Sequence, residues 1–205
     1  MDIILVGAFS EMIELADLCG SDITGIIDVR EAPGYPLTYL GKDDDARAIF
    51  GEYGDKADII LSPDIPIVRE KLFAFYKNIG FRIGSLLSPH ARISKSANLD
   101  VEGLMVQSGV NLSANTVIGR GVRLNVNANV MHDCVVGAFT TIAPNAVLLG
   151  KVTLGSRVYV GANTTILPGI TVGDDVIIGA GAVVTKNIEK GDVVAGVPAR
   201  VIRKQ

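Results

Sequence analysis

A histidine and an aspartate stand side by side in the segment NVNANVMHDCVVGAF, residues 125–139. Imidazole is largely neutral at pH 7 and still accepts a proton, so a histidine beside a reacting amine or hydroxyl can act as a general base. A carboxylate can orient the ring only if the backbone turns between them, because successive strand residues point to opposite faces. His132 is therefore a candidate base and Asp133 its candidate partner. The alternative is a solvated pair on a surface turn.

The segments around this pair repeat with a period of six residues. Every sixth position from Val106 to Val184, fourteen in all, is leucine, isoleucine or valine. Glycine often follows this aliphatic residue, and a small or β-branched residue stands four positions after it. Such a repeat predicts a solenoid of short strands and tight turns, in which three strands close a triangular coil. Coils stacked at about 4.8 Å would bury the aliphatic residues along the axis.

The repeat sets the expected limits of the solenoid. Ile93 and Leu99 continue the pattern backwards, and the step of seven from Leu99 to Val106 predicts one bulged residue. We therefore expect coils over about 90–189. The closing segment KGDVVAGVPARVIRKQ predicts a terminal strand and a capping helical turn.

The first eighty-eight residues have a different spacing of apolar residues. MDIILV, ITGIID and ADIILS are strand-like, whereas EMIELADLCG, DDDARAIFGEYG and PIVREKLFAFYKNIG have helical spacing. Alternating strands and helices predict a small parallel, Rossmann-like sheet over 1–88, followed by the all-β solenoid domain with its C-terminal cap over 89–205.

Ligands of such sheets lie at the carboxyl ends of the strands. These positions, which we expect to bind the substrate, are Gly7, Ala8, Phe9, Ser10, Asp28 and Ser62. The turn GAFSE lacks a full GxGxxG, so a dinucleotide is not expected, but Asp28 could hold a ribose or a base. The alternative is a sheet that only supports the solenoid.

Composition excludes several classes of protein. The net charge is −3 and the basic residues are scattered, so nucleic acid is not an expected partner. No apolar stretch reaches the roughly 18 residues of a membrane span. Cys19 and Cys134 form no CxxC pair, which fits a cytoplasmic protein. His90 and His132 are 42 residues apart, which is not a multiple of eighteen, so no zinc site of three histidines, as in carbonic-anhydrase-type solenoids, is expected.

Three segments carry a resemblance to a known family: LNVNANVMHDCVVGAFTTIAPNAVLLGKVTLG, VGANTTILPGITVGDDVIIGAGAVVTKNI and AGVPAR. They resemble hexapeptide-repeat acyltransferases with an N-terminal Rossmann-like domain, which acetylate nucleotide-linked amino sugars or sialic acids. The resemblance implies a left-handed parallel β-helix and acetyl-CoA bound between neighbouring solenoids of a homotrimer. It also implies that His132 is the general base, that Asp133 orients it, and that Asn125 borders the acceptor pocket. Thr141 replaces a second histidine that usually contacts the acyl donor.

The coil length adds candidates for binding acetyl-CoA. Gly150 follows His132 by eighteen residues, so it should stack beside it and offer its amide to the thioester oxygen or the oxyanion. Ala162 and Ala180 belong to a file of small residues along which a pantetheine arm could lie, although close packing of coils explains them equally well. Lys186 could meet the CoA 3′-phosphate, or be solvated.

These observations favour an acetyl-CoA-dependent N-acetyltransferase that acts on the 4-amino group of a nucleotide-linked deoxysugar in bacterial surface-glycan synthesis. Sialic acid O-acetylation is the alternative within the class, and a non-catalytic trimeric assembly protein is the alternative outside it. Phe9, Ser10 and Glu11 replace the family's glycine-rich, histidine-containing turn, and Val29 replaces an acidic residue. The nucleotide therefore stays open.

Overall fold

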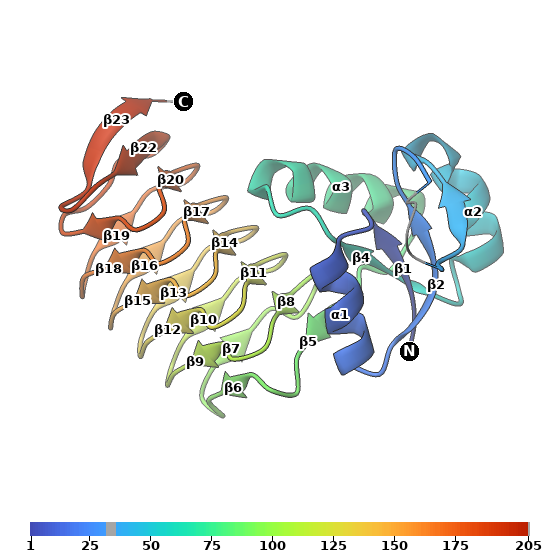
Figure 1. Ribbon diagram of the computed structural model, residues 1–205, viewed down its shortest axis with the longest axis horizontal. Helices are drawn as coiled ribbons and strands as arrows, with labels where there is room; N and C mark the ends of the chain where they lie inside the picture. Colours follow the sequence, from blue (N-terminus) through green and yellow to red (C-terminus); the bar gives the residue numbers. More distant parts are fainter. Residues whose placement is uncertain (32–35, 205) are drawn as a thin grey trace.

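The computed structural model describes residues 1–31 and 36–204, which form an α/β domain beside a long solenoid (Figure 1). The N-terminal elements are β1 (Asp2–Val6), α1 (Ser10–Leu18), β2 (Asp22–Ile27), β3 (Tyr39–Gly41), the 3₁₀ turn η1 (Asp43–Asp45), α2 (Ala46–Tyr53), β4 (Asp58–Leu61) and α3 (Pro66–Ile79). The four strands make a parallel sheet in the order β3-β2-β1-β4. The predicted alternation of strands and helices is confirmed.

The sheet is covered by helices on both faces, as the alternating pattern requires. Ile3 and Leu5 of β1 pack with α1, whereas Ile4 packs in a second cluster that includes residues of α2 and α3. Helix α3 begins with Pro66, which tolerates this position because the first N–H groups of a helix have no intrahelical acceptor. It is capped at its C-terminal end by Gly80, which has a φ of 118°. None of the helices in the described part of the chain has the length and apolar character needed to cross a membrane.

The solenoid has three flat faces made of two-residue parallel strands. The first flat contains β5 (Leu86–Leu87), β8 (Met105–Val106), β11 (Arg123–Leu124), β14 (Thr141–Ile142), β17 (Tyr159–Val160) and β20 (Ile177–Ile178). The second contains β6 (Arg92–Ile93), β9 (Asn111–Leu112), β12 (Asn129–Val130), β15 (Val147–Leu148), β18 (Thr165–Ile166) and β21 (Val183–Val184). The third contains β7 (Asn98–Leu99), β10 (Val117–Ile118), β13 (Val135–Val136), β16 (Thr153–Leu154) and β19 (Thr171–Val172).

The aliphatic residues of the six-residue repeat fill the interior of this prism. From Val106 to Val184 they are all buried in one cluster. Successive coils are eighteen residues apart in register, so that Val130 lies between Leu112 and Leu148. The predicted bulge is also present, because β7 and β8 are joined by a longer turn in which Gly103 has a φ of 72°.

Three corners join the flats along the whole stack of coils, and each corner is named after one of its residues. The Val126 corner joins the first flat to the second, the His132 corner joins the second to the third, and the Phe139 corner leads back to the first. Asn127, Asp133 and Phe139 have φ near 60° at these turns. This left-handed conformation is easiest for glycine, asparagine and aspartate.

The C-terminal cap differs from the expected one. β22 (Asp192–Ala195) joins the first flat beside β20, and β23 (Arg200–Lys204) runs back antiparallel to β22. The predicted helical turn is therefore wrong. A returning strand satisfies the backbone N–H and C=O groups at the free edge of β22, which a helical turn would leave unpaired.

The N-terminal domain rests on the first flat, near its early coils (Figure 1). Leu86 and Met105 of this flat share a buried cluster with α1, and Phe139 packs in a cluster with Phe73 of α3. The first flat is therefore a domain interface at these coils, while the His132 corner lies outside it.

Candidate active site

His132 and Asp133 project from the His132 corner into solvent. The left-handed turn at Asp133, with a φ of 60°, brings the two side chains together, and His132 Nδ1 lies 2.9 Å from Asp133 Oδ2. Their side chains are 54% and 41% exposed. The contact that strand alternation would forbid is thus made by the turn.

Asp133 is held as an anion by its neighbours. Its Oδ1 accepts a hydrogen bond of 3.0 Å from Asn115 Nδ2, one coil earlier. The hydrogen bond with His132, followed by that with Asn115, lowers the pKa of Asp133. Because an ionised carboxylate only accepts, we assign the shared proton to Nδ1 of His132. Nε2 is then the free acceptor, which is the state a general base needs.

Gly150 lies against the ring of His132 from the next coil. A Cβ on Gly150 would stand 2.6 Å from Nε2 and 2.5 Å from Cε1 of the ring, so a side chain there would displace the imidazole. The N–H groups of Leu149 and Lys151 donate to carbonyl groups of neighbouring coils. The N–H of Gly150 has no acceptor among the described residues. A free amide donor therefore lies beside the candidate base, as the eighteen-residue step predicts.

The other residues expected to bind acetyl-CoA lie on two corners. Lys186 is exposed on the His132 corner, three coils beyond His132, or about 14 Å along the axis. Ala162 and Ala180 lie on the Val126 corner, the first half-buried and the second exposed. Gly150 and Lys186 therefore lie on one corner and Ala162 and Ala180 on another, so a single solenoid does not bring these four candidates to one edge.

Thr141 occupies a position that excludes contact with the acyl donor. It is fully buried in the first flat. Its Oγ1 donates to the Asp64 carbonyl over 2.7 Å and accepts from Arg69 Nη2 over 3.0 Å. The expectation that Thr141 contacts the donor is therefore wrong. The physical reason is that the segment before α3 covers this flat, so a side chain that would be solvated on a bare solenoid lies in the domain interface.

The residues expected at the strand ends of the N-terminal sheet do come together. Gly7 has a φ of 91°, and a Cβ there would stand 2.8 Å from the ring of Phe9. The N–H of Ala8 donates to Asp28 Oδ2 over 2.9 Å, which ties the ends of β1 and β2. Ser62 follows β4 and is fully buried, and its hydroxyl has no partner among the described residues. Ser10 begins α1 directly after this loop.

A cavity of about 420 Å³ lies between α1 and the Val126 corner. Its apolar wall consists of Leu15, Leu18, Val126 and Pro144. Its polar wall consists of Glu11, Glu14, Asp64, Gln107, Ser108, Arg123 and Asn125. Asn125, expected at the acceptor pocket, therefore does border a pocket. His132 of the same chain is not among the lining residues.

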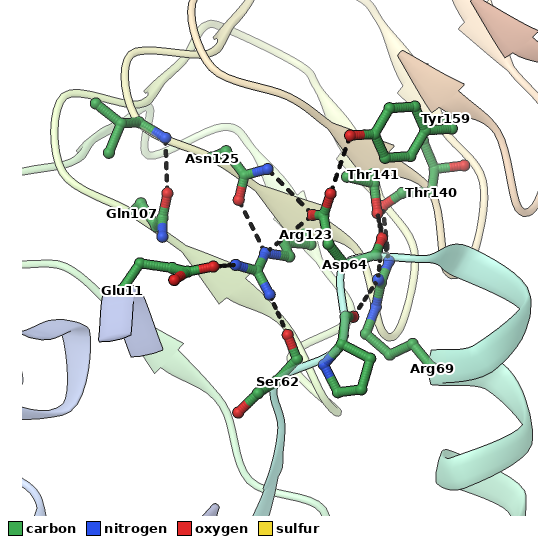
Figure 2. A network of polar contacts seen from close by, with 12 residues as sticks. Glu11, Ser62, Asp64, Arg69, Gln107, Arg123, Asn125, Thr140, Thr141 and Tyr159 are labelled. Carbon is green, nitrogen blue, oxygen red and sulfur yellow. Dashed lines mark hydrogen bonds and ion pairs between the residues drawn. The ribbon is translucent and has the colours of Figure 1, made fainter. Parts of the chain in front are cut away.

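Arg123 organises the polar wall, as Figure 2 shows. Its side chain is 2% exposed and crosses from the first flat to the N-terminal domain. Nε donates to Asn125 Oδ1 over 2.8 Å, Nη2 donates to Glu11 Oε1 over 3.0 Å, and Nη1 donates to the Ser62 carbonyl. The guanidinium thus links the end of β4, the first turn of α1 and the solenoid.

Asp64 is the second organising residue of this network (Figure 2). Its carboxylate accepts hydrogen bonds from the Tyr159 hydroxyl over 3.0 Å and from Asn125 Nδ2 over 3.2 Å. It also lies 3.3 Å from Arg123 Nε. Burial, followed by the charge of Asp64, raises the pKa of Tyr159 to about 12, so its hydroxyl stays a donor at neutral pH.

Arg69 locks α3 onto the solenoid. It is fully buried, and its guanidinium donates to the carbonyl groups of Gly121 and Phe139 over 2.8 Å each and of Asp64 over 3.0 Å. Burial lowers its pKa to about 9, which still leaves it charged at neutral pH. Sequence reasoning missed Arg69, Arg123 and Asp64. The sequence held one signal for this interface, which is Arg123, a long cationic side chain at an outward repeat position on the flat that the N-terminal domain covers.

The described residues contain no group of three or more histidine, cysteine, aspartate and glutamate side chains placed to hold a metal ion. His90 stands on the Val126 corner and His132 on the next corner, so the two histidines do not converge. The chain offers a base beside an amide donor at the His132 corner and a carboxylate-lined pocket at the Val126 corner.

Comparisons with known proteins agree with this geometry. The family model described as bacterial transferase hexapeptide (six repeats) matches residues 115–150 and 151–186. A GDP-perosamine N-acetyltransferase from Caulobacter crescentus, solved with CoA and GDP-perosamine, is 28% identical over 100% of this chain and 98% of its own, with a TM-score of 0.91. The acetyltransferase domain of PglB from Neisseria gonorrhoeae, solved with acetyl coenzyme A, is 27% identical over 98% of both chains, with a TM-score of 0.85.

WeeI from Acinetobacter baumannii is a further structural relative, 26% identical over 98% of this chain and 100% of its own, with a TM-score of 0.86. No curated protein sequence matches the chain. The repeat over residues 115–186 is that of the bacterial transferase hexapeptide model. Over its whole length, N-terminal domain included, the chain is similar to acetyltransferases of known structure that were solved with CoA or acetyl-CoA.

Proposed function

We propose that the protein transfers the acetyl group of acetyl-CoA to the 4-amino group of a nucleotide-linked deoxysugar, with His132 as the general base. One observation carries the proposal: the ring of His132, oriented by Asp133, lies beside the free amide of Gly150. The full-length likeness to enzymes solved with CoA and GDP-perosamine, or with acetyl-CoA, supports the choice of substrates. The product would serve surface-glycan synthesis from the cytoplasm.

The proposed reaction uses the two free groups at this corner. Nε2 of His132 removes a proton from the neutral amine as its nitrogen attacks the thioester carbon, and the Gly150 amide donates to the developing oxyanion. The new C–N bond forms, the C–S bond breaks, and the imidazolium returns its proton to the CoA thiolate. An amine that arrives as an ammonium releases its other proton to water, so one proton is released for each turnover.

The strand-end loop is the proposed nucleotide site. Gly7 leaves the backbone open to close approach, and Asp28, which already accepts from Ala8 and Val29 amides, retains lone pairs for ribose or base donors. Helix α1 leads from this loop to the cavity, where Asn125 would border the sugar. The nucleotide and its sugar would then lie along one continuous path.

A homotrimer with sites between subunits completes the proposal. The cavity lies at the Val126 corner, whereas His132 stands on a different corner of the same chain. A sugar in the cavity would therefore meet a His132 from a neighbouring copy. Acetyl-CoA would lie between Gly150 and Lys186 of one copy and Ala162 and Ala180 of the next.

The test is acceptor-dependent release of thiol from acetyl-CoA, with GDP-, UDP- and dTDP-linked 4-amino sugars as acceptors. We expect His132→Ala to lower kcat by about 10²- to 10⁴-fold, because general-base catalysis typically contributes that much. Thermal shifts with each nucleotide identify the ligand, since binding to the native state raises the apparent stability. Full activity of His132→Ala would refute the mechanism, and no shift with acetyl-CoA would favour an assembly protein.

A further inference from the structure

The carboxylate of Asp133 is held at two points, by side chains from two different coils. Its Oδ2 lies 2.9 Å from His132 Nδ1, and its Oδ1 accepts from Asn115 Nδ2 over 3.0 Å. With one contact alone, the carboxylate could turn toward solvent about its own side-chain bonds. With both oxygen atoms engaged, it keeps the orientation in which Oδ2 faces the imidazole.

The repeated turn of the solenoid brings Asn115 within reach of this carboxylate. Asn115, Asp133 and Lys151 follow one another at eighteen-residue steps, with φ of 59°, 60° and 63°. Because the same turn is repeated, equivalent side chains leave neighbouring coils in similar directions, and stacked strands are only about 4.8 Å apart. The short amide of one coil therefore meets the short carboxylate of the next.

The backbone beneath both side chains is anchored to the coils before it. The N–H of Asp133 donates to the Ala114 carbonyl over 2.9 Å. The N–H of Asn115 donates instead to a side chain, Ser96 Oγ, over 3.1 Å. Since the two corners are fixed in this way, little conformational freedom beyond side-chain rotation is lost when the amide meets the carboxylate.

The groups around Asp133 favour its ionised form. The hydrogen bond with His132, followed by that with Asn115, lowers the pKa of Asp133, and the charge of Lys151 acts in the same direction. An ionised carboxylate has no proton to donate, so the proton between the two side chains belongs to Nδ1 of His132. The protonation of the ring therefore depends on a carboxylate that stays in place.

We propose that Asn115 is a positioning residue of the acetyl transfer. By holding Asp133, it keeps His132 in the tautomer with a proton on Nδ1, whose Nε2 is free to accept the proton of the acceptor amine. The inference rests on the proposed function and deepens it, because it adds a third side chain to the pair of His132 and Asp133. Asn115 acts through Asp133 and not on the reacting atoms.

The tautomer can be measured without substrates, because the chain contains only two histidines. Long-range nitrogen–proton correlation spectra of isotope-labelled histidine, at about pH 8.5, where an ordinary histidine is neutral, report which ring nitrogen carries the proton. For the native protein we expect the Nδ1–H form of His132 to predominate. Predominance of the Nε2–H form would overturn the inference. His90, on the Val126 corner, is the internal control.

Two variants remove the amide donor. Asn115→Gly keeps full freedom for the left-handed turn, and Asn115→Ala removes the same group with a less permissive residue. In both we expect the Nε2–H form of His132 to increase and His90 to stay unchanged. With a 4-amino sugar as acceptor, kcat should fall about three- to tenfold, the factor that one net hydrogen bond carries.

A matched control and a second background show whether the effect passes through Asp133. Asn145→Gly removes an exposed asparagine with a φ of 60° from the Val126 corner and should leave the His132 tautomer unchanged. In the background Asp133→Gly, which already lacks the carboxylate, adding Asn115→Gly should change neither the tautomer nor kcat, because the contact that couples the two residues is gone.

Each result decides one claim. An unchanged tautomer in both Asn115→Gly and Asn115→Ala would overturn the inference, and a lowered melting temperature without a change of tautomer would mark Asn115 as merely structural. An equal effect of Asn145→Gly, or a further fall in kcat in the Asp133→Gly background, would also overturn it. The spectra are recorded without substrate, so they decide this point by themselves. Absence of acetylation of every amino sugar by the native protein would instead overturn the proposed function.

Discussion

At the scale of single residues, the site depends on one left-handed turn and one missing side chain. Asp133 reaches His132 because its φ is near 60°, and Gly150 leaves room for the ring because it has no Cβ. Both requirements concern backbone conformation and space, not the reactivity of a side chain. Both follow from the eighteen-residue coil, which sets a corner residue directly against its counterpart on the next coil.

Replacing Gly150 by alanine tests this dependence. Because the new Cβ would lie within about 2.6 Å of the imidazole, the ring must move away from the reacting position. We expect kcat to fall about tenfold to hundredfold, as for a misplaced catalytic group, while the protein stays folded. The measurement is steady-state kinetics with the thiol assay. Gly51→Ala, where a Cβ meets nothing within 4 Å, is the control and should retain full activity.

At the scale of elements, the sequence predicts the repeated coils of the solenoid but not the packing of the N-terminal domain against them. The buried ladder from Val106 to Val184 and the stacking of Gly150 on His132 follow from period alone. Thr141 and Arg123 could not be placed in the same way, because each occupies an outward repeat position that reads as solvated. Only the docking of α1 and α3 on the first flat turns these positions into an interface, and docking leaves no periodic signal.

The cap shows the same limit in a different form. The segment after Gly191 keeps the strand propensity of the repeat, but its partner is set by which edge is free. β23 pairs back onto β22, whereas a helical turn was expected. Local pattern gives the type of an element more readily than its neighbour, because pairing between distant segments is decided by the whole fold.

A second contact between elements makes stability depend on pH. Arg157 at the Phe139 corner donates to both carboxylate oxygens of Asp175 on the next coil, over 2.6 and 3.0 Å, and to Glu70 of α3 over 3.2 Å. The hydrogen bond from Arg157 is the main cause that lowers the pKa of Asp175. A carboxylate whose pKa is depressed on folding stabilises the native state above its unfolded pKa, near 4, and this contribution is lost as the pH falls through the folded value.

We therefore expect Asp175→Asn to lower the free energy of unfolding by about 1 kcal/mol at pH 7, a value that allows for solvent screening of a partly exposed pair. The difference from the native protein should shrink when the pH is lowered from 7 to about 3, because the native Asp175 begins to be protonated as the pH falls toward its depressed pKa. Urea unfolding at the two pH values measures it. Asp17→Asn should show no such difference, and a gap between native and Asp175→Asn that widened at low pH would contradict the assignment.

At the scale of the whole molecule, the two halves of the site stand on different corners of one chain. The cavity opens at the Val126 corner beside α1, and His132 stands one flat away. Neither the N-terminal domain nor the solenoid of a single copy unites base and cavity. An assembly around a threefold axis in which each copy faced the cavity of the next with its His132 corner would unite them.

Mixed assemblies separate a shared site from a site within one chain. One variant is His132→Ala, which lacks the base. The other is the double variant Asp28→Ala with Asn125→Ala, which keeps the base but weakens the nucleotide loop and the cavity. Each alone should be nearly inactive. Co-expressed with different affinity tags and purified through both, the mixed trimers would place an intact cavity against an intact His132 at about one of their three sites.

The expected recovery is therefore about a third of native kcat per site at unchanged KM, since each restored site contains only native contacts. A site confined to one chain would give no recovery, because every chain in the mixture carries one defect. Mixing the two purified variants without subunit exchange is the control and should stay inactive. Recovery with a raised KM would mean that the N-terminal defect reaches the restored sites, so that more than two copies contribute to each one.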